Sequence, residues 1–511
     1  MRTKKIILNG LSELIPYFII SIIAFVKVRV MIDNLGSEFN GYYQFINQII
    51  TYLFLVEAGF GSAVLFKLYK PMADNNQKKV SEIFNGSITI FRKIGALILT
   101  LLIAITLVLP FTVTNDEHLF TIIISFIIIG FSQTIPYFFY SKSYSILLFS
   151  EQKNYIYSII VNMIKIIIDV GIIVVVIITD SLINVAVVML IGKILEEIIA
   201  DFLCSRMYKW LDKKAKKDIS AHKMTKDIIY HKIGELVVNN VDSIILMTFI
   251  GPIAVSIYAT YNYISSFLTQ VIAKIDSGII STFGNIFSKE DNDTSFKLFK
   301  EFSIISDIMA FIVPICFILG GRSFINLWIG KESYILSYWV VAMFASIIFF
   351  KCIVRPINTV ITANGMFRET KYYAFFAAGT NLLLSIMLVK PLGIFGILFA
   401  TVIGYMVSLT LRVKLVYNHK FDFINKKLEY TTIILKIIIY MIIVFLLKPI
   451  EGMIFSYELS IINFLLLIGS IFVILTLSTG IIIYKYNTNF KSVYSKVINS
   501  IFKRSKVVWI I

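Results

Sequence analysis

The chain has 511 residues, of which 58% are hydrophobic and 15% charged, and its formal net charge is +17. This composition excludes a water-soluble protein, because apolar windows of about 18 or more residues recur along the whole length, as they do in polytopic membrane proteins. The sequence contains no phosphate-binding loop, and its cysteines and histidines lack metal-ligand spacing. We therefore expect an all-α membrane protein without a metal or cofactor.

The apolar windows predict about fourteen membrane-spanning helices. Most of the 48 Lys and Arg residues fall in loops or helix ends on one side, the side that also holds Met1. This asymmetry follows the positive-inside rule, so we predict a multi-pass protein of the cytoplasmic membrane with both termini in the cytoplasm. Because the charges follow the topology, they do not indicate a nucleic-acid partner. The predicted spans cover residues 8–32, 40–68, 84–110, 119–149, 154–179, 182–203, 227–250, 254–283, 297–319, 335–361, 371–389, 394–416, 430–447 and 460–484.

An internal repeat organises these spans. The segment "LGSEFNGYYQFINQI", which starts at Leu35, aligns with "IGPIAVSIYATYNYI", which starts at Ile250, at an offset of 215 residues. Six spans separate the two copies, so equivalent helices cross the membrane in the same direction, as in a parallel repeat. The aligned identities are Gly36 with Gly251, Tyr43 with Tyr258 and Asn47 with Asn262.

The repeat predicts the domain organisation. A six-helix N-terminal lobe is expected over 1–205, a basic cytoplasmic linker over 206–226 and a six-helix C-terminal lobe over 227–418. Two further helices, numbers 13 and 14, occupy 430–484, and 485–511 form a basic cytoplasmic tail. The two lobes are predicted to form pseudo-symmetric bundles.

Several segments resemble those of a known family. The run "VMIDNLGSEFNGYYQFINQIITYLFLVEAGFGSAVLFKLYKPMADNN" is similar to the N-terminal signature of the polysaccharide transporter family, the Wzx-type oligosaccharide flippases of the multidrug/oligosaccharidyl-lipid/polysaccharide flippase superfamily. The segments "FINLWIG", "ITANGMFRET" and "NLLLSIMLVKPLGIFGILFATVIGY" resemble later parts of that family in the same order. The resemblance covers roughly residues 10–415.

This resemblance implies two six-helix bundles around a central cavity, alternating access, and no enzyme activity. The implied substrate is an oligosaccharide repeat unit on undecaprenyl pyrophosphate, destined for capsule, exopolysaccharide or O-antigen. Membrane lipids, a polysaccharide polymerase and chain-length machinery are the implied partners. By position alone, the two additional helices resemble the pair with which lipid II flippases form a groove for the lipid tail.

Basic residues within the spans are the candidates for substrate binding. Lys351 and Arg355 lie one turn apart and, at about 1.5 Å per residue, about 24 and 30 Å along their helix from its outer end. Lys274 lies at a similar depth in another span. We predict that these cations line a water-filled vestibule and bind the pyrophosphate, since Arg presents a fork of donors and Lys a compact charge. Pairing with acids such as Glu57 or Asp276 is the alternative.

Two further cations are more ambiguous. Lys165 lies near mid-membrane, four residues before Asp169, so the two form either an intrahelical ion pair or part of the cavity. Arg29 and Lys27 lie near the outer end of the first span, where they either reach the interface or face the cavity.

The acidic residues Glu57, Asp169, Asp242 and Asp276 are candidates for coupling to H⁺ or Na⁺, or for balancing the cations. Aromatic residues at equivalent outer ends of the repeats, Tyr43 and Tyr258, either stack on sugar rings or anchor the interface.

Two other functions stay open. An ion-coupled drug or cation antiporter of the same superfamily would line its lumen with acids and aromatic residues rather than with Lys and Arg. A membrane polysaccharide polymerase is the less favoured reading, because such an enzyme needs a sizeable outer loop and the outer loops here are short.

Overall fold

The computed structural model describes residues 2–57, 59–113, 117–220, 241–287, 292–457 and 459–486. The elements in these ranges are all helices, which confirms the predicted all-α class. Nine described helices are long and apolar enough to cross a membrane. The chain divides into two compact units, Met1–Thr260 and Tyr261–Ile511. Parts of the predicted linker and tail, 221–226 and 487–511, lie outside the described residues, and the lobe boundaries stay a prediction.

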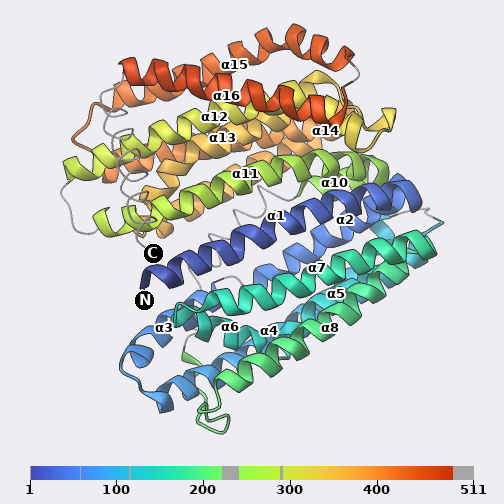
Figure 1. Ribbon diagram of the computed structural model, residues 1–511, viewed down its shortest axis with the longest axis vertical. Coiled ribbons are helices and arrows are strands. Elements are labelled where there is room, and N and C mark those ends of the chain that lie inside the picture. Colours follow the sequence, from blue (N-terminus) through green and yellow to red (C-terminus); the bar gives the residue numbers. More distant parts are fainter. Residues whose placement is uncertain are drawn as a thin grey trace, which may run out of the picture. The chain divides into compact units, whose positions relative to one another are not determined.

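The first unit is built from helices of very different lengths (Figure 1). Helix α1 packs along α7, and α8 packs against both α5 and α7. In chain order the elements are α1 (Arg2–Asn34), α2 (Gly36–Leu53), the 3₁₀ turn η1 (Phe54–Glu57), α3 (Phe60–Ala73), α4 (Gln77–Thr112), α5 (Leu119–Thr134), the 3₁₀ turn η2 (Ile135–Tyr137), α6 (Ser141–Ser150), α7 (Asn154–Thr179), α8 (Leu182–Met207), α10 (Asp242–Phe249) and the beginning of α11 (Pro252–Phe287).

Two of the predicted spans are interrupted. The span predicted over 40–68 breaks at η1 and at Gly59, whose φ of 82° lies in the left-handed region that glycine adopts without strain. The span predicted over 119–149 breaks at η2, where Pro136 lacks an N–H donor. Glu57 ends η1 at the first break, and Lys142 lies in the first turn of α6, shortly after the second.

The repeat has a structural counterpart in its two turn glycines. Gly36 and Gly251 have φ angles of 89° and 121°; Gly36 is the first residue of α2, and Gly251 immediately precedes α11. Helix α2 also lies very close to the start of α11, because a Cβ atom on Gly41 would be 1.9 Å from the carbonyl oxygen of Pro252. Asn40 Nδ2 donates a hydrogen bond to Ser256 Oγ over 2.6 Å at this contact.

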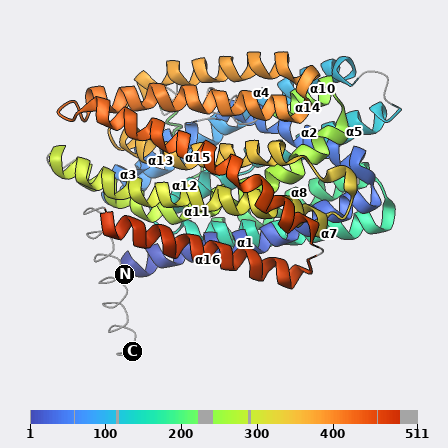
Figure 2. The ribbon, with the colours of Figure 1, turned by 90° about the horizontal axis from the view of Figure 1, so that it is seen from above.

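The second unit is organised around α13, the most buried of the nine spans (Figure 2). Helices α12 and α14 pack on α13, and α15 and α16 pack on α12. Helix α14 is broken at Gly393, where φ is 59° and ψ is −137°, between the spans predicted over 371–389 and 394–416. The elements are the remainder of α11, α12 (Asn292–Trp328), the 3₁₀ turn η4 (Glu332–Tyr334), α13 (Tyr338–Ala363), α14 (Phe367–His419), α15 (Lys426–Ser456) and α16 (Ile461–Tyr486).

Candidate functional site

A polar stripe runs along the C-terminal half of α13. In this helix, 83% of the most apolar window is buried. From Lys351 to Thr362 the accessible positions are Lys351, Arg355, Asn358 and Thr362, and the residues between them are buried. Their spacing of four, three and four residues places them on one face of the helix. A polar stripe of this kind is unfavourable against acyl chains.

The neighbouring helices orient the cations of this stripe. Arg355 Nη2 donates a hydrogen bond to the carbonyl oxygen of Thr269 on α11 over 3.3 Å. Lys351 Nζ lies 5.9 Å from the centroid of the Tyr405 ring on α14. A backbone carbonyl and an aromatic ring are thus among the groups that orient these two cations.

Two further cations belong to the same helices. Arg412 on α14 donates a hydrogen bond to Asn358 Oδ1, and sequence analysis did not identify it. Lys274 is half-buried on α11, five residues beyond the Thr269 that accepts from Arg355. Asp276 lies on the same helix, but its side chain is outside the described residues. Arg412 thus adds a basic residue of α14 to the polar stripe of α13, and the backbone of α11 holds Arg355 at Thr269.

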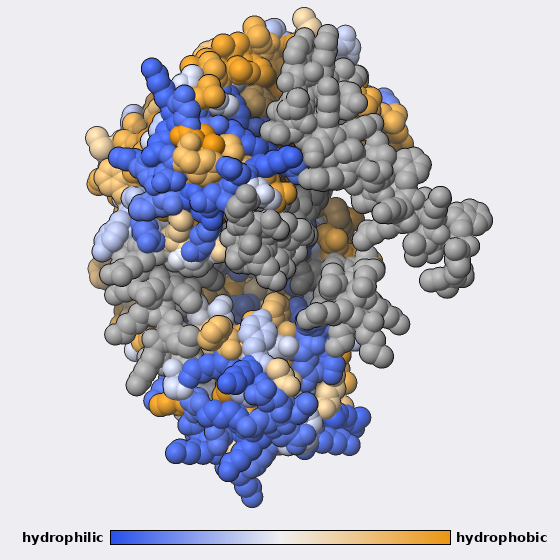
Figure 3. All heavy atoms as spheres, turned by 90° about the vertical axis from the view of Figure 1, so that its left-hand side faces the viewer, coloured by the Kyte–Doolittle hydropathy of each residue, from blue (hydrophilic) through white to orange (hydrophobic). Residues whose placement is uncertain are grey.

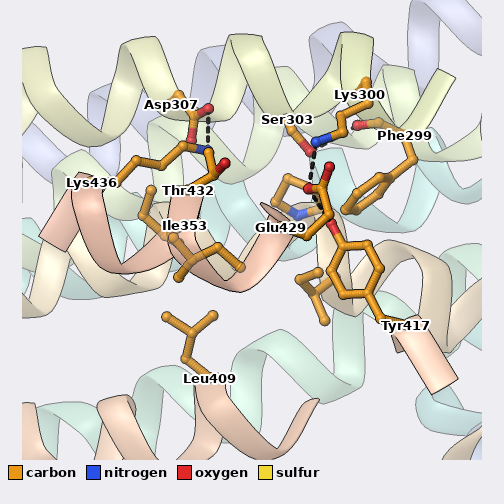
Figure 4. Close-up of a pocket in the computed structure, with 13 residues that line it drawn as sticks. Phe299, Lys300, Ser303, Asp307, Ile353, Leu409, Tyr417, Glu429, Thr432 and Lys436 are labelled. Atoms are coloured by element: carbon orange, nitrogen blue, oxygen red, sulfur yellow. Dashed lines mark hydrogen bonds and ion pairs between the residues drawn. The ribbon is translucent and has the colours of Figure 1, made fainter. Parts of the chain in front are cut away.

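A small pocket lies behind this stripe, between α12, α13, α14 and α15 (Figure 4). Lys436 Nζ is 2.6 Å from Asp307 Oδ2 on one side of the pocket. On the other side Lys300 pairs with Glu429, which also accepts a hydrogen bond from Tyr417 Oη over 2.9 Å. The partner of Asp307 thus lies on α15, one of the two additional helices.

Helices α12 and α15 are joined by a ladder of three ion pairs. The third pair links Arg322 to Glu451, with 3.3 Å between Arg322 Nη1 and Glu451 Oε2. In all three pairs the partners are 129 residues apart in the sequence. A constant separation means that the two helices run parallel in one fixed register. The sign of the charge on α12 alternates along the ladder, which disfavours other registers.

In the first unit, the partner of Asp169 lies on another helix, α1. Lys27 Nζ on α1 donates to Asp169 Oδ1 on α7 over 2.5 Å, and both residues are buried. The ammonium also lies 5.9 Å from the centroid of the Tyr43 ring. Lys165 is exposed, and the ion-pair partner of the Asp169 carboxylate is Lys27 rather than Lys165.

Arg29 is exposed and pairs with Asp33 one turn along α1, at 3.5 Å. Asp242, 2% exposed, accepts a hydrogen bond from Tyr258 Oη over 2.7 Å. Tyr43 and Tyr258 are each only 5% exposed, so in this conformation their rings pack inside the protein.

Glu57 lies where the two interrupted spans of the first unit meet. It accepts hydrogen bonds from Tyr137 in η2 and from Lys142 in α6. The Lys142 ammonium lies 3.7 Å from the Tyr137 ring centroid, so the acid, the base and the ring form one cluster. Sequence analysis identified Glu57 but not Lys142, because it treated both spans as continuous helices.

No family model matches the sequence, and no curated protein matches it significantly. Solved structures do. A lipid II flippase MurJ in an inward closed conformation is similar, with a TM-score of 0.65 at 13% identity over 92% of this chain and 98% of that chain. An inward-facing multidrug resistance MATE transporter has a TM-score of 0.64 at 12% identity, over 80% of this chain and 96% of that chain.

A eukaryotic MATE transporter is also similar, with a TM-score of 0.56 at 11% identity over 83% of this chain and 96% of that chain. These neighbours are transporters and flippases rather than enzymes. At such low identity the likeness concerns the fold alone, and the chain therefore has the fold seen in these MATE and MurJ structures.

Proposed function

We propose that the protein is a flippase that carries an undecaprenyl-pyrophosphate-linked oligosaccharide across the cytoplasmic membrane by alternating access. The polar stripe of α13 is the observation that carries this proposal. Lys351 and Arg355 present two positive charges on the accessible face of an otherwise buried helix. A diphosphate cannot cross a bilayer core unaided, because desolvation of its charges is too costly. Arg and Lys side chains replace water around its oxygens.

The additional helices also support this proposal. The lipid II flippase structure matches 92% of the chain, whereas the two MATE structures match 80% and 83%. Helix α15 is tied to α12 by the ion-pair ladder, so it moves with α12 as one body. A carrier lipid needs an apolar surface beside the polar path, and α15 and α16 expose many large apolar side chains.

An ion-coupled drug or cation antiporter is the second candidate, and the likeness to MATE transporters favours it. Its cationic substrate would be repelled by the basic stripe of α13. For either function, the buried carboxylates Asp169 and Asp242 are our candidates for coupling to H⁺ or Na⁺.

Complementation of a deletion strain tests the proposal. We expect wild-type protein to restore surface polysaccharide, and K351A/R355A to leave the lipid-linked precursor on the inner leaflet at normal protein levels. The matched variant K351R/R355K keeps both charges and should retain part of the export. Unchanged polysaccharide in the deletion strain, together with sensitivity to cationic dyes, would instead favour the antiporter.

A further inference from the structure

The segment after α8, Tyr208–Ser220, is fixed to the first turns of α4 by backbone hydrogen bonds. Asn85 Nδ2 donates to the carbonyl oxygens of Asp212 and Ala215, over 3.0 and 3.1 Å. The Asp212 N–H donates to Ser81 Oγ over 3.1 Å, and the Asp218 N–H donates to the carbonyl oxygen of Glu82 over 2.9 Å. These four hydrogen bonds engage backbone groups between Asp212 and Asp218, so they fix the conformation of the segment against α4.

The side chain of Asp218 also links the segment to α3 and α4. Its carboxylate lies 2.9 Å from Lys79 Nζ and 4.0 Å from Lys67 Nζ, and it accepts from the Ser220 N–H over 3.0 Å. Gly86 permits the approach, because a Cβ atom there would be 2.0 Å from the Asp218 carbonyl oxygen. We call Asp218 and its partners on α3 and α4 the linker latch.

The latched segment displays a dense group of cations. Lys209, Lys214, Lys216 and Lys217 are all exposed. Asp218 is engaged by the latch and Asp212 accepts from the Lys214 N–H over 2.8 Å, so the acids of the segment bond locally. Figure 3 shows hydrophilic side chains gathered over the end of the first unit where α3, α8 and this segment meet.

The position of these lysines relative to the bilayer follows from α8. The last two turns of α8 expose Phe202, Leu203 and Met207 by 52%, 38% and 40%, as expected of a surface that faces acyl chains. The first lysine comes two residues after this apolar surface, and the others follow within ten residues. Basic residues so close to the end of a membrane helix lie at headgroup level, within the roughly 8–10 Å over which salt leaves their attraction effective.

We propose that the latched segment is a binding platform for anionic phospholipid headgroups of the adjoining leaflet. The latch contributes by keeping the lysines together at one depth, so that several ammonium groups act on the same lipids. The platform is separate from the substrate cations of α13, and it is required neither by the flippase function nor by the antiporter function.

Native mass spectrometry of the full-length protein, with phosphatidylglycerol or phosphatidylcholine as added lipid, tests the platform. K209A/K214A/K216A/K217A should weaken the tightest phosphatidylglycerol binding by about tenfold or more and leave phosphatidylcholine binding unchanged. The matched control K414A/K420A/K426A/K427A removes the same charge from the last turns of α14, the first turn of α15 and the connection between them, and it should have little effect. Equal losses in both quadruple variants would overturn the assignment.

The latch itself is tested by D218N. This substitution makes the segment more positive, so a simple count of charges predicts equal or tighter phosphatidylglycerol binding. If the latch is needed to hold the lysines together, D218N should bind phosphatidylglycerol severalfold more weakly. Equal or tighter binding by D218N would overturn the role of the latch. Inorganic phosphate is the competitor that distinguishes the ligand source: if millimolar phosphate displaces the lipid, the site recognises soluble phosphate and the lipid assignment is wrong.

Discussion

Lys27 on α1 and Asp169 on α7 form a buried ion pair, 2.5 Å long, that joins the two helices in the interior of the first unit. Removing one member leaves an uncompensated charge, which costs about 3–5 kcal/mol in buried pairs. We therefore expect K27A and D169N each to lower the apparent melting temperature in detergent. The swapped variant K27D/D169K should recover much of the loss. The control R29A removes an exposed pair worth about 1 kcal/mol or less. A neutral effect of both K27A and D169N would contradict this account.

The ladder between α12 and α15 predicts charge-swap rescue at a defined register. E451Q should be the most destabilising single change, because Glu451 is 2% exposed. D307K and K436D should each destabilise the protein, whereas the double variant D307K/K436D should restore most of the stability. Thermal unfolding measures this, with K297A on the exposed side of α12 as the control. Destabilisation that simply adds in the double variant would show that the ladder does not fix the register.

The linker latch predicts resistance to trypsin across neutral pH. Partial burial of the Asp218 carboxyl opposes its ionisation, but hydrogen bonds from Ser220 and Lys79 together outweigh it and hold its pKa well below the ordinary value of 3.8. A lowered folded-state pKa contributes stability that is fully present above the unfolded value and is lost as the pH falls through the folded value. Cleavage after Lys216 and Lys217 should therefore be slow and insensitive to pH from about 6 to 9.

In D218N the same bonds should be cleaved severalfold faster throughout that range, with no change in cleavage elsewhere. A wild-type cleavage rate that rises between pH 9 and pH 6 would contradict the lowered pKa of Asp218.

Gly86 should be essential to the same latch for steric reasons. G86A places a methyl group 2.0 Å from the Asp218 carbonyl oxygen, where backbone atoms must separate. We expect G86A to be cleaved after Lys216 and Lys217 as fast as D218N, although G86A retains every charge. G379A is the matched control, because a Cβ atom at Gly379 has no neighbour within 4 Å. If G86A and G379A are equally resistant, the close contact between α4 and the linker does not form.

The sequence predicted the positions of the helices better than their partners. Apolar windows locate the spans because lipid imposes length and hydropathy on each helix separately. The aligned glycines Gly36 and Gly251 prove to be equivalent, because each supplies a positive φ where a helix begins. The break that follows Glu57 was missed, since a short polar interruption barely lowers the mean hydropathy of a long window. Proline marks the other break, at Pro136, because it lacks a backbone donor.

The pairs that side chains form across helices could not be predicted from the sequence. Counting residues along a helix gives the depth of a charge, but the neighbour that it faces depends on packing between helices. This is why the sequence offered Lys165, on the same helix, as a partner for Asp169 and did not indicate Lys27 on α1. The ladder did leave a signal, since Lys300, Asp307 and Arg322 are complementary in charge to Glu429, Lys436 and Glu451 at one separation.

Flipping of the substrate in proteoliposomes tests the central proposal most directly. Lipid-linked oligosaccharide extracted from the deletion strain would be reconstituted with purified protein, and its transfer would be followed by the accessibility of its sugar to an added lectin. We predict transfer by the wild type, loss of most of the rate in K351A/R355A, and partial transfer by K351R/R355K. Transfer at the wild-type rate by K351A/R355A, with the protein folded and inserted, would contradict the assignment of the α13 stripe to the pyrophosphate.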